Sequence, residues 1–251
     1  MCGIFGAVGK IEKSRWMALA MYNASRGLHS AGIAYHSNAL RIEKIAQHPF
    51  RAFNGMLSKG IDRGIEGGVL FGHTRWATMG EINNDNAHPW FTQDKEFVYA
   101  HNGHITNHQT FGSYEVDSQS LGTGISEKDF SKYQGKIGLC WIDQQKNLFL
   151  YKHDQELSMA IKKDVVYFSS DGDHLKAIGL VPQELKENYI YRIRYGRVLG
   201  KEKVPSPTRS IEYSPKFWQT RSVSGHLDSF ERVDNFEQEN DPKWIFPREV
   251  K

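Results

Sequence analysis

Several short segments of this chain are apolar at both odd and even positions, and this pattern constrains the fold more than any other feature. Examples are VLFGHTRW at 69–76, KIGLCWID at 136–143 and DVVYFSS at 164–170. A strand with one face in water alternates apolar and polar residues, whereas a strand that is apolar on both faces has both faces covered. The sequence therefore predicts stacked sheets with helices packed outside them.

A helix and a β-hairpin are expected near the N-terminus. The run CGIFGAV at 2–8 predicts a buried strand, and Ser14 follows it as a candidate helix N-cap. AGIAYH at 31–36 and ALRIEKIAQ at 39–47 flank a Ser-Asn pair and predict the two strands of the hairpin. The expected helix is marked by residues at helical spacing, namely Trp16, Leu19, Ala20 and Asn23.

The composition changes near residue 200. Five of the 8 prolines lie beyond it, but only one of the 23 glycines does. Several Phe and Trp residues are also found there. We expect residues 1–200 to form one domain of mixed α and β structure. Residues 201–251 are expected to form a Pro- and aromatic-rich C-terminal extension that packs on the domain or on a partner.

Charge and cysteine content exclude several classes of protein. The chain has 32 Lys and Arg against 29 Asp and Glu, with no basic run, so nucleic acid is not an expected partner. No segment has the length and apolarity of a membrane span, and the N-terminus lacks the pattern of a signal peptide. The two cysteines, Cys2 and Cys140, suit a reducing compartment, and we expect a cytoplasmic protein.

Six short islands carry residues with chemical potential. They are CGIFG at 2–6, RGLHSAG at 26–32, GHTRWATMG at 72–80, NAHPW at 86–90, HNGHITN at 101–107 and EVDSQSL at 115–121. Taken singly, each has an ordinary structural explanation. Cys2 could be a buried small hydrophobe, Arg75 a surface charge, Gly103 part of a turn and Asp117 a helix N-cap.

Taken together and in this order, the islands resemble the glutaminase domain of the class II glutamine amidotransferases, which are N-terminal-nucleophile hydrolases. The pattern is most similar to that of the glutaminase half of glucosamine-6-phosphate synthase: CGI.G, RG.DSAG, GHTRWATHG, NAHP, HNG..N and a later DT or DS. The likeness covers about residues 2–200. It implies a four-layer αββα sandwich, with two stacked sheets between helical layers.

The resemblance also implies a mechanism. Met1 is removed, and the freed α-amine of Cys2, whose ordinary pKa is near 8, accepts the proton of the Cys2 thiol. The thiol attacks the side-chain amide of L-glutamine and forms a thioester, and ammonia leaves. Asn102 and the backbone N–H of Gly103 are the implied donors to the oxyanion. No cofactor and no metal are expected.

Further residues match family positions around the glutamine. Arg75 suits the α-carboxylate of the substrate, because a guanidinium can donate two parallel hydrogen bonds, and Asp117 suits the α-ammonium. Trp76 and Thr78 match positions that line the substrate pocket. Three more positions match family residues that support the active site. They are Arg26 and Gly27 beside the nucleophile and His88 in the NAHP motif.

Two positions depart from the family pattern. Residue 29 is His where the pattern has Asp, and residue 79 is Met where the pattern has a second His. The first change is expected to alter a hydrogen bond that supports the Arg26 loop. The second removes a polar side chain near the glutamine carboxylate, although a backbone contact there would survive. Neither change removes the nucleophile, so we expect activity to persist.

Alternatives remain open at this level. His73, His88 and His101 lie in motif segments, but their spacing matches no familiar metal site. The chain could be an N-terminal-nucleophile amidase that acts on another amide, or a catalytically weak binding subunit with the same fold. About fifty residues follow the glutaminase-like region, too few for an acceptor domain. We therefore expect a glutaminase subunit that delivers ammonia to a separate synthetase, with the extension as a candidate docking element.

Overall fold

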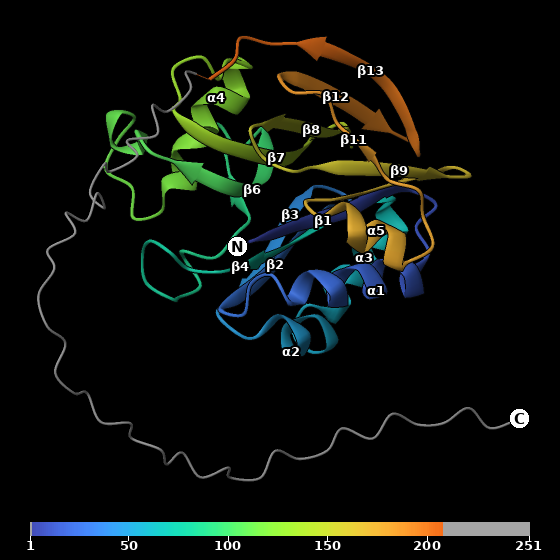
Figure 1. The fold of residues 1–251 in the computed structure, drawn as a ribbon. Coiled ribbons are helices and arrows are strands. Elements are labelled where there is room, and N and C mark those ends of the chain that lie inside the picture. The colour runs from blue at the N-terminus through green and yellow to red at the C-terminus, as the bar shows by residue number, and fades with distance from the viewer. Residues whose placement is uncertain (1, 208–251) are drawn as a thin grey trace, which may run out of the picture. The chain divides into compact units, whose positions relative to one another are not determined.

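The computed structural model describes residues 2–207, and most of these residues lie in two antiparallel sheets (Figure 1). The first sheet contains β1 (Gly3–Gly9), β2 (Ser30–His36), β3 (Leu40–Ile45), β4 (Val69–Arg75), β9 (Ser158–Lys162), β10 (Val165–Ser169) and β11 (Gln183–Glu184). The second contains β5 (Trp90–Phe91), β6 (Phe97–Ile105), β7 (Gly135–Asp143), β8 (Leu148–His153), β12 (Tyr189–Arg194) and β13 (Arg197–Lys203). The strand orders are β11-β9-β10-β1-β4-β2-β3 and β13-β12-β8-β7-β6-β5.

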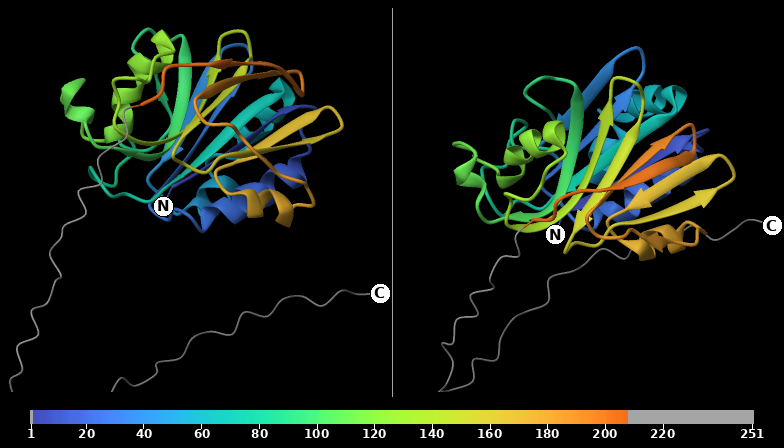
Figure 2. Two further views of the ribbon diagram at one scale, coloured as in Figure 1. Left: turned by 45° about the horizontal axis from the view of Figure 1, so that its top comes forward. Right: turned by 90° about the horizontal axis from the view of Figure 1, so that it is seen from above.

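Helices lie outside both sheets, so the expected αββα order of layers is confirmed (Figures 1 and 2). The first sheet is covered by α1 (Lys13–Ala24), α2 (Pro49–Asn54), α3 (Ser58–Gly67) and α5 (Gly172–Ala177). The layer on the second sheet is thinner. It consists of α4 (Leu121–Glu127) and the 3₁₀ turns η1 (His108–Thr110) and η2 (Asp117–Ser120).

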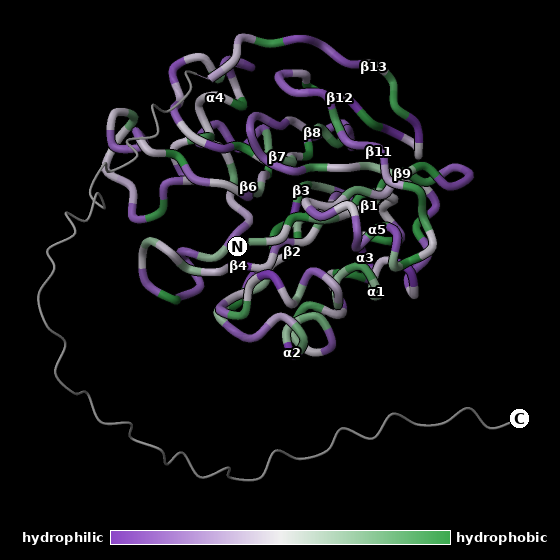
Figure 3. Tube along the Cα trace, viewed as in Figure 1, coloured by the Kyte–Doolittle hydropathy of each residue, from purple (hydrophilic) through white to green (hydrophobic). Residues whose placement is uncertain are grey.

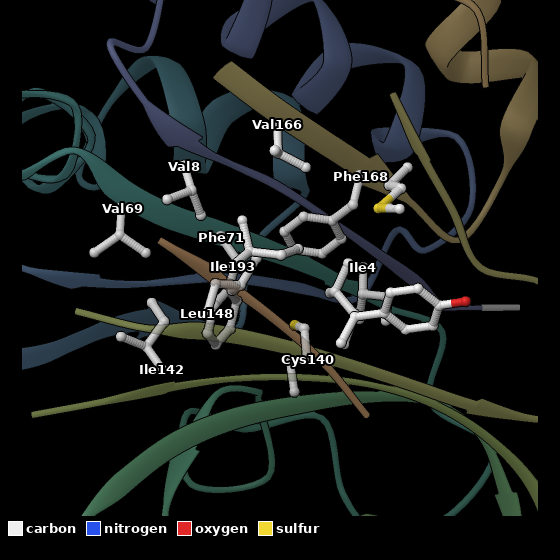
Figure 4. Close-up of a cluster of buried hydrophobic side chains, with 14 of the residues drawn as sticks. Ile4, Val8, Val69, Phe71, Cys140, Ile142, Leu148, Val166, Phe168 and Ile193 are labelled. Atoms are coloured by element: carbon white, nitrogen blue, oxygen red, sulfur yellow. The ribbon is translucent and has the colours of Figure 1, made fainter. Parts of the chain in front are cut away.

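Strand β1 shows why the strands are apolar at both parities. Ile4 and Val8 belong to the core between the two sheets, which Figure 4 shows at close range. Phe5, at the opposite parity, packs instead against Trp16 of α1, with ring centroids 5.3 Å apart. Each face of the strand thus has its own apolar partner layer, as the sequence predicted. Apolar residues accordingly concentrate along the central strands in the hydropathy view (Figure 3).

The expected hairpin is confirmed, but the expected helix cap is wrong. β2 and β3 pair antiparallel from Ala31↔Ile45 to His36↔Leu40. Helix α1 begins at Lys13, one residue before Ser14, and its N-cap residue is Glu12. The Ser14 hydroxyl donates to the Glu12 carboxylate at 3.0 Å instead of accepting from the helix backbone. The other four helices and strands β5, β9 and β11 were not predicted from the sequence.

The expected domain boundary at residue 200 lies inside a strand. β13 continues to Lys203, and the N–H of buried Val204 donates to the carbonyl of Asn188 at 3.0 Å. Of the expected extension at 201–251, the part from 208 onward lies outside the described residues. Among the helices of the described part, none has both the length and the apolar character needed to cross a membrane.

Candidate active site

The thiol of Cys2 is held by the main chain of Trp76. Cys2 precedes β1, and the antiparallel pairing of Gly3 with Thr74 places it opposite the end of β4. The Trp76 N–H donates to Cys2 Sγ at 3.4 Å, and the Cys2 S–H is 3.7 Å from the Trp76 carbonyl oxygen that accepts it. Sheet pairing therefore sets the position of the thiol.

The surroundings of Cys2 favour the neutral thiol. Burial raises the pKa of Cys2 and is the largest influence. The Trp76 N–H and the positive charge of Arg75 oppose this effect, whereas the carboxylate of Asp117 adds to it. A neutral thiol needs a base that takes its proton as it attacks. The other cysteine, Cys140, lies in the core between the sheets, where burial raises its pKa well above the ordinary value (Figure 4).

Arg26 anchors the residue that carries the thiol. Its Nε donates to the Cys2 carbonyl at 3.0 Å, and its NH1 donates to the Asp171 carboxylate at 2.8 Å. Gly27 lies directly against the backbone of Arg75, because a Cβ on residue 27 would be 2.5 Å from the Arg75 carbonyl carbon. A glycine is thus required where this loop crosses the end of β4.

Arg75 lies beside Cys2, and its side chain orders the loop that follows β4. The residue is 2% exposed. NH1 donates to the Glu81 carbonyl at 2.9 Å, and NH2 donates to the Met79 carbonyl. A guanidinium has five N–H donors, so these two bonds leave donors for an anion. Burial lowers the pKa of Arg75, and the charges of Cys2 and Asp117 act in the opposite direction.

Asp117 is the acidic group of this site. Its carboxylate is buried and accepts the Ile105 N–H at 2.7 Å, which joins η2 to the end of β6. His104 Nδ1 lies 3.5 Å from the same carboxylate. The alternative role of helix N-cap is not filled by Asp117, because it is the first residue of η2 and the cap residue is Val116. The charge of Asp117 acts on the pKa of both Cys2 and Arg75.

Asn102 and Gly103 lie on β6, which contacts the strand headed by Cys2. Asn102 is 3% exposed, and its side-chain Nδ2 has no hydrogen-bond partner among the described residues. An unpaired buried donor costs free energy unless a ligand accepts from it. Gly103 has φ +150°, and a Cβ there would lie 1.9 Å from the Lys136 carbonyl oxygen, so no other residue fits.

Trp76 and Thr78 differ from their neighbours in exposure. Trp76 is 42% exposed, and Thr78 is also exposed, which leaves both side chains accessible to a substrate. His88, in contrast, is 2% exposed, and its ring stacks on His73 at 3.8 Å between centroids. Both ring nitrogens of His88 lack a partner among the described residues. His88 therefore packs beneath the 76–89 loop and has no described contact with the Cys2 thiol.

The three motif histidines, His73, His88 and His101, are buried, and burial lowers the pKa of each below its ordinary value. Burial lowers the pKa of His73 to about 3 and that of His88 well below the ordinary value. His101 bonds the Ser118 hydroxyl through Nδ1 at 2.8 Å. Within residues 2–207, no group of three or more His, Cys, Asp or Glu side chains is arranged to hold a metal ion.

Two residues of the site were missed by sequence reasoning. Asp171 pairs with Arg26, and the segment YFSSDGDHL that contains it continues the family likeness more loosely, so this signal could have identified it. The contact of His29 with the loop after β4 was not predicted. His29 Nδ1 accepts the Ala77 N–H at 2.8 Å. The sequence marked residue 29 as a departure from the family pattern but did not indicate this partner.

The architecture and the cysteine ahead of the first strand define a fold of the N-terminal-nucleophile hydrolase type. Two solved structures share it. One is described as the allosteric regulatory enzyme of purine biosynthesis and has a TM-score of 0.65. It is 17% identical in sequence, and the match covers 80% of this chain and 49% of the chain of that enzyme. The other is the glutamine phosphoribosylpyrophosphate amidotransferase of B. subtilis, with a TM-score of 0.61, 17% identity and the same two coverages.

Sequence comparison gives the family. The model for glutamine amidotransferases class-II matches residues 1–186, and the chain belongs to this family of enzymes. The glutamine–fructose-6-phosphate aminotransferase (isomerizing) of Clostridium perfringens is 38% identical over 121 residues, which are 47% of this chain and 19% of that protein. The enzyme of the same name from Methanococcus maripaludis is 26% identical over 68% of this chain and 33% of its own length. The chain thus spans about a fifth to a third of these relatives.

Proposed function

We propose that this chain is a glutaminase that hydrolyses the side-chain amide of L-glutamine to glutamate and ammonia through a thioester on Cys2. The observation that carries the proposal is the hydrogen bond of the Cys2 thiol to the Trp76 N–H, directly after Arg75, with Asp117 bonded to Ile105 at the end of β6. A guanidinium and a carboxylate suit the two charged groups of an α-amino acid. The family membership supports glutamine as that amino acid.

The chemistry begins at the thiol. Once Met1 has been removed, the α-amine of Cys2 takes the thiol proton while Sγ attacks the amide carbon. The negative charge then falls on the amide oxygen, which accepts from Asn102 Nδ2 and from the Gly103 N–H. When the tetrahedral intermediate collapses, the ammonium group of Cys2 returns the proton to the leaving nitrogen, and ammonia departs. Water attacks the thioester, the sulfur leaves as the thiol and glutamate is released.

The remaining residues position these groups in the proposal. Arg26 fixes the Cys2 carbonyl, and Gly27 allows the Arg26 loop to lie on Arg75. Trp76 and Thr78 line the entrance, because both are exposed beside the thiol. His88 contributes by ordering the loop between Arg75 and β5.

The test compares matched cysteine variants. The intact mass first establishes that Met1 is absent, and glutamate release from glutamine is then measured. We expect Cys2→Ala to abolish hydrolysis and Cys140→Ala to retain it, because Cys140 is buried in the core. Hydrolysis that survives in Cys2→Ala would overturn the proposal. Asparagine and simple amides are assayed beside glutamine, and a preference for one of them would favour a different amidase.

The ammonia acceptor is part of the proposal. We infer that ammonia passes to a synthetase on a separate protein, and that both proteins are cytoplasmic. The names of the relatives from Clostridium perfringens and Methanococcus maripaludis indicate enzymes that transfer an amino group to fructose 6-phosphate. A pull-down from the native host, followed by an ammonia-transfer assay on the recovered protein, tests this inference. Transfer by this chain alone would contradict the need for a separate acceptor.

A further inference from the structure

His29 contacts the turn that holds the Cys2 thiol through both its main chain and its side chain. It lies between α1 and β2, and its N–H donates to the Arg75 carbonyl at 3.0 Å. Its Nδ1 accepts the Ala77 N–H at 2.8 Å. Its ring also packs on the Trp76 indole, with centroids 4.8 Å apart and planes inclined by 31°. Residue 29 thus contacts three consecutive residues, the last residue of β4 and the two that follow it.

Two rigid peptide units connect His29 to the thiol. The unit between Arg75 and Trp76 carries the carbonyl that accepts from His29 and the N–H that donates to Cys2 Sγ. The unit between Trp76 and Ala77 carries the carbonyl that accepts from Cys2 and the N–H that donates to His29 Nδ1. A trans peptide is planar, with its N–H and C=O on opposite sides. Fixing one side of each plane therefore orients the side that faces Cys2.

We propose that His29 is a positioning residue for the nucleophile, whose unprotonated Nδ1 fixes the Trp76–Ala77 peptide plane against the Cys2 thiol. This inference depends on the proposed role of Cys2. The bond from the Ala77 N–H requires Nδ1 to be the acceptor nitrogen of a neutral imidazole, with the ring proton on Nε2. The position of the thiol therefore depends on the hydrogen-bond acceptor at residue 29.

Other titratable and charged groups surround the same turn and have to be separated from His29. Arg26, Arg75 and Asp117 face Cys2 from three elements. Two further histidines lie next to carboxylates of the site, His104 beside Asp117 and His174 beside Asp171. Substitutions at residue 29 alone leave all of these groups in place, so a difference between such variants reports on residue 29.

Three substitutions separate the functions of the side chain. The Oδ1 of an asparagine can occupy the place of the histidine Nδ1 and accept the same hydrogen bond, so His29→Asn keeps the acceptor without the ring. His29→Asp keeps an acceptor that bears a charge. His29→Phe keeps a ring on Trp76 but has no acceptor, and it controls for the stacking contact.

The experiment measures kcat and KM for glutamine hydrolysis at pH 8. We expect kcat of His29→Phe to fall by about 3- to 10-fold, the effect of losing one neutral hydrogen bond, with KM nearly constant. We expect His29→Asn to recover most of this loss, and His29→Asp, which also keeps an acceptor, to recover part of it. Full activity in His29→Phe, or no recovery in His29→Asn, would overturn the proposal.

A second measurement keeps the proposal separate from the glutaminase activity. The amide proton of Ala77 is followed by NMR, and alkylation of Cys2 by iodoacetamide is followed by peptide mass spectrometry. At one fixed pH, the Ala77 resonance and the alkylation rate should both change in His29→Phe and return toward the wild-type values in His29→Asn. If the wild type hydrolyses no glutamine but both quantities change in this way, the proposed function fails and the positioning role stands. If hydrolysis occurs and neither quantity differs between the wild type and His29→Phe, the positioning role fails alone.

Discussion

Arg26 donates to the carbonyl of Cys2 from a loop 24 residues along the chain. The same guanidinium pairs with Asp171, which lies at the N-terminus of α5. The Arg26 side chain thus connects the start of β1 to α5. Cys2 is held at two points, its carbonyl by Arg26 and its sulfur by the Trp76 N–H.

The first prediction concerns Arg26. Arg26→Ala leaves the Cys2 carbonyl and the Asp171 carboxylate without this donor. A hydrogen bond to a charged group contributes about 1.5–3 kcal/mol, so we expect kcat for glutamine to fall by about 10- to 100-fold with little change in KM. Lys176→Ala removes an exposed ion pair with Asp173 and is the control, since such pairs contribute little. Steady-state kinetics that show equal kcat for both variants would contradict the anchoring role.

The second prediction separates the side chain of Arg75 from the loop carbonyls that it binds. Arg75→Ala should raise the glutamine KM by about 10- to 100-fold through loss of a charged clamp worth about 1.5–3 kcal/mol. Met79→Ala should change KM by less than about threefold, because Arg75 binds the carbonyl of Met79 and not its side chain. Initial rates over a range of glutamine concentrations give both values. An unchanged KM in Arg75→Ala would refute the carboxylate assignment.

The third prediction distinguishes activity from stability at Asn102. Because Nδ2 of Asn102 has no described partner, Asn102→Ala should lower the free energy of unfolding by less than about 1 kcal/mol. It should lower kcat by about 10²–10³ if Nδ2 donates to the oxyanion. The matched control is Asn147→Ala. Asn147 Nδ2 donates to Asp143 at 2.6 Å, so this variant should lose about 1–3 kcal/mol of stability and keep its activity.

Urea unfolding and glutaminase assays on these two asparagine variants show whether Asn102 contributes to activity or to stability. A stable Asn102→Ala protein with normal kcat would exclude Asn102 from oxyanion stabilisation. A strongly destabilised one would indicate that the side chain has a structural role in β6.

The fourth prediction uses the buried histidines. His73 has a pKa of about 3 in the folded protein, against about 6.5 when unfolded, so the unfolded state binds the additional proton below that value. The contribution that neutral His73 makes to the free energy of unfolding is thus fully present above about pH 6.5. It is lost progressively as the pH falls toward 3. At pH 5 the loss that His73 causes is about 2 kcal/mol. Burial lowers the pKa of His88 in the same direction.

His88→Phe removes one of these groups and keeps a ring against His73 and Trp90. We expect the loss of unfolding free energy between pH 8 and pH 5 to be smaller in this variant than in the wild type. Denaturation at the two pH values measures the difference, and an equal loss in both proteins would contradict it. Because His88 is proposed to order the loop, the glutamine KM should stay within about threefold of the wild-type value. A much larger KM would indicate a direct role in binding.

Much of this architecture follows from local patterns. The apolar strands with both faces covered predicted two sheets between helical layers, and the hairpin at 31–47 was recognised from its flanking strands. The order of the family motifs along the chain pointed to Cys2, Arg75 and Asn102, and the family is confirmed. The roles assigned to these residues stay predictions until the variants above are measured.

Other features could not be obtained in this way. The first turn of α1 was misplaced because no side chain caps this helix: Glu12 occupies the N-cap position, and its carboxylate accepts from the side chains of Ser14 and Arg15. The thin helical layer on the second sheet, where α4 has 7 residues, could not be anticipated from strands that are apolar on both faces.

By itself the sequence determined the family motifs and the longer strands, because these depend on residue type and on neighbours within a few positions. The tertiary structure alone decided what the motif residues touch. Antiparallel pairing of β1 with β4 brings the Cys2 thiol to the Trp76 main chain, 74 positions away. Pairing of β1 with β10 brings Asp171, which follows β10, to the same end of the sheet, where Arg26 binds it. The tertiary structure also gave His29 the Ala77 amide as its partner. Such contacts depend on strand order and register, which are set by the packing of the whole core and not by any local pattern.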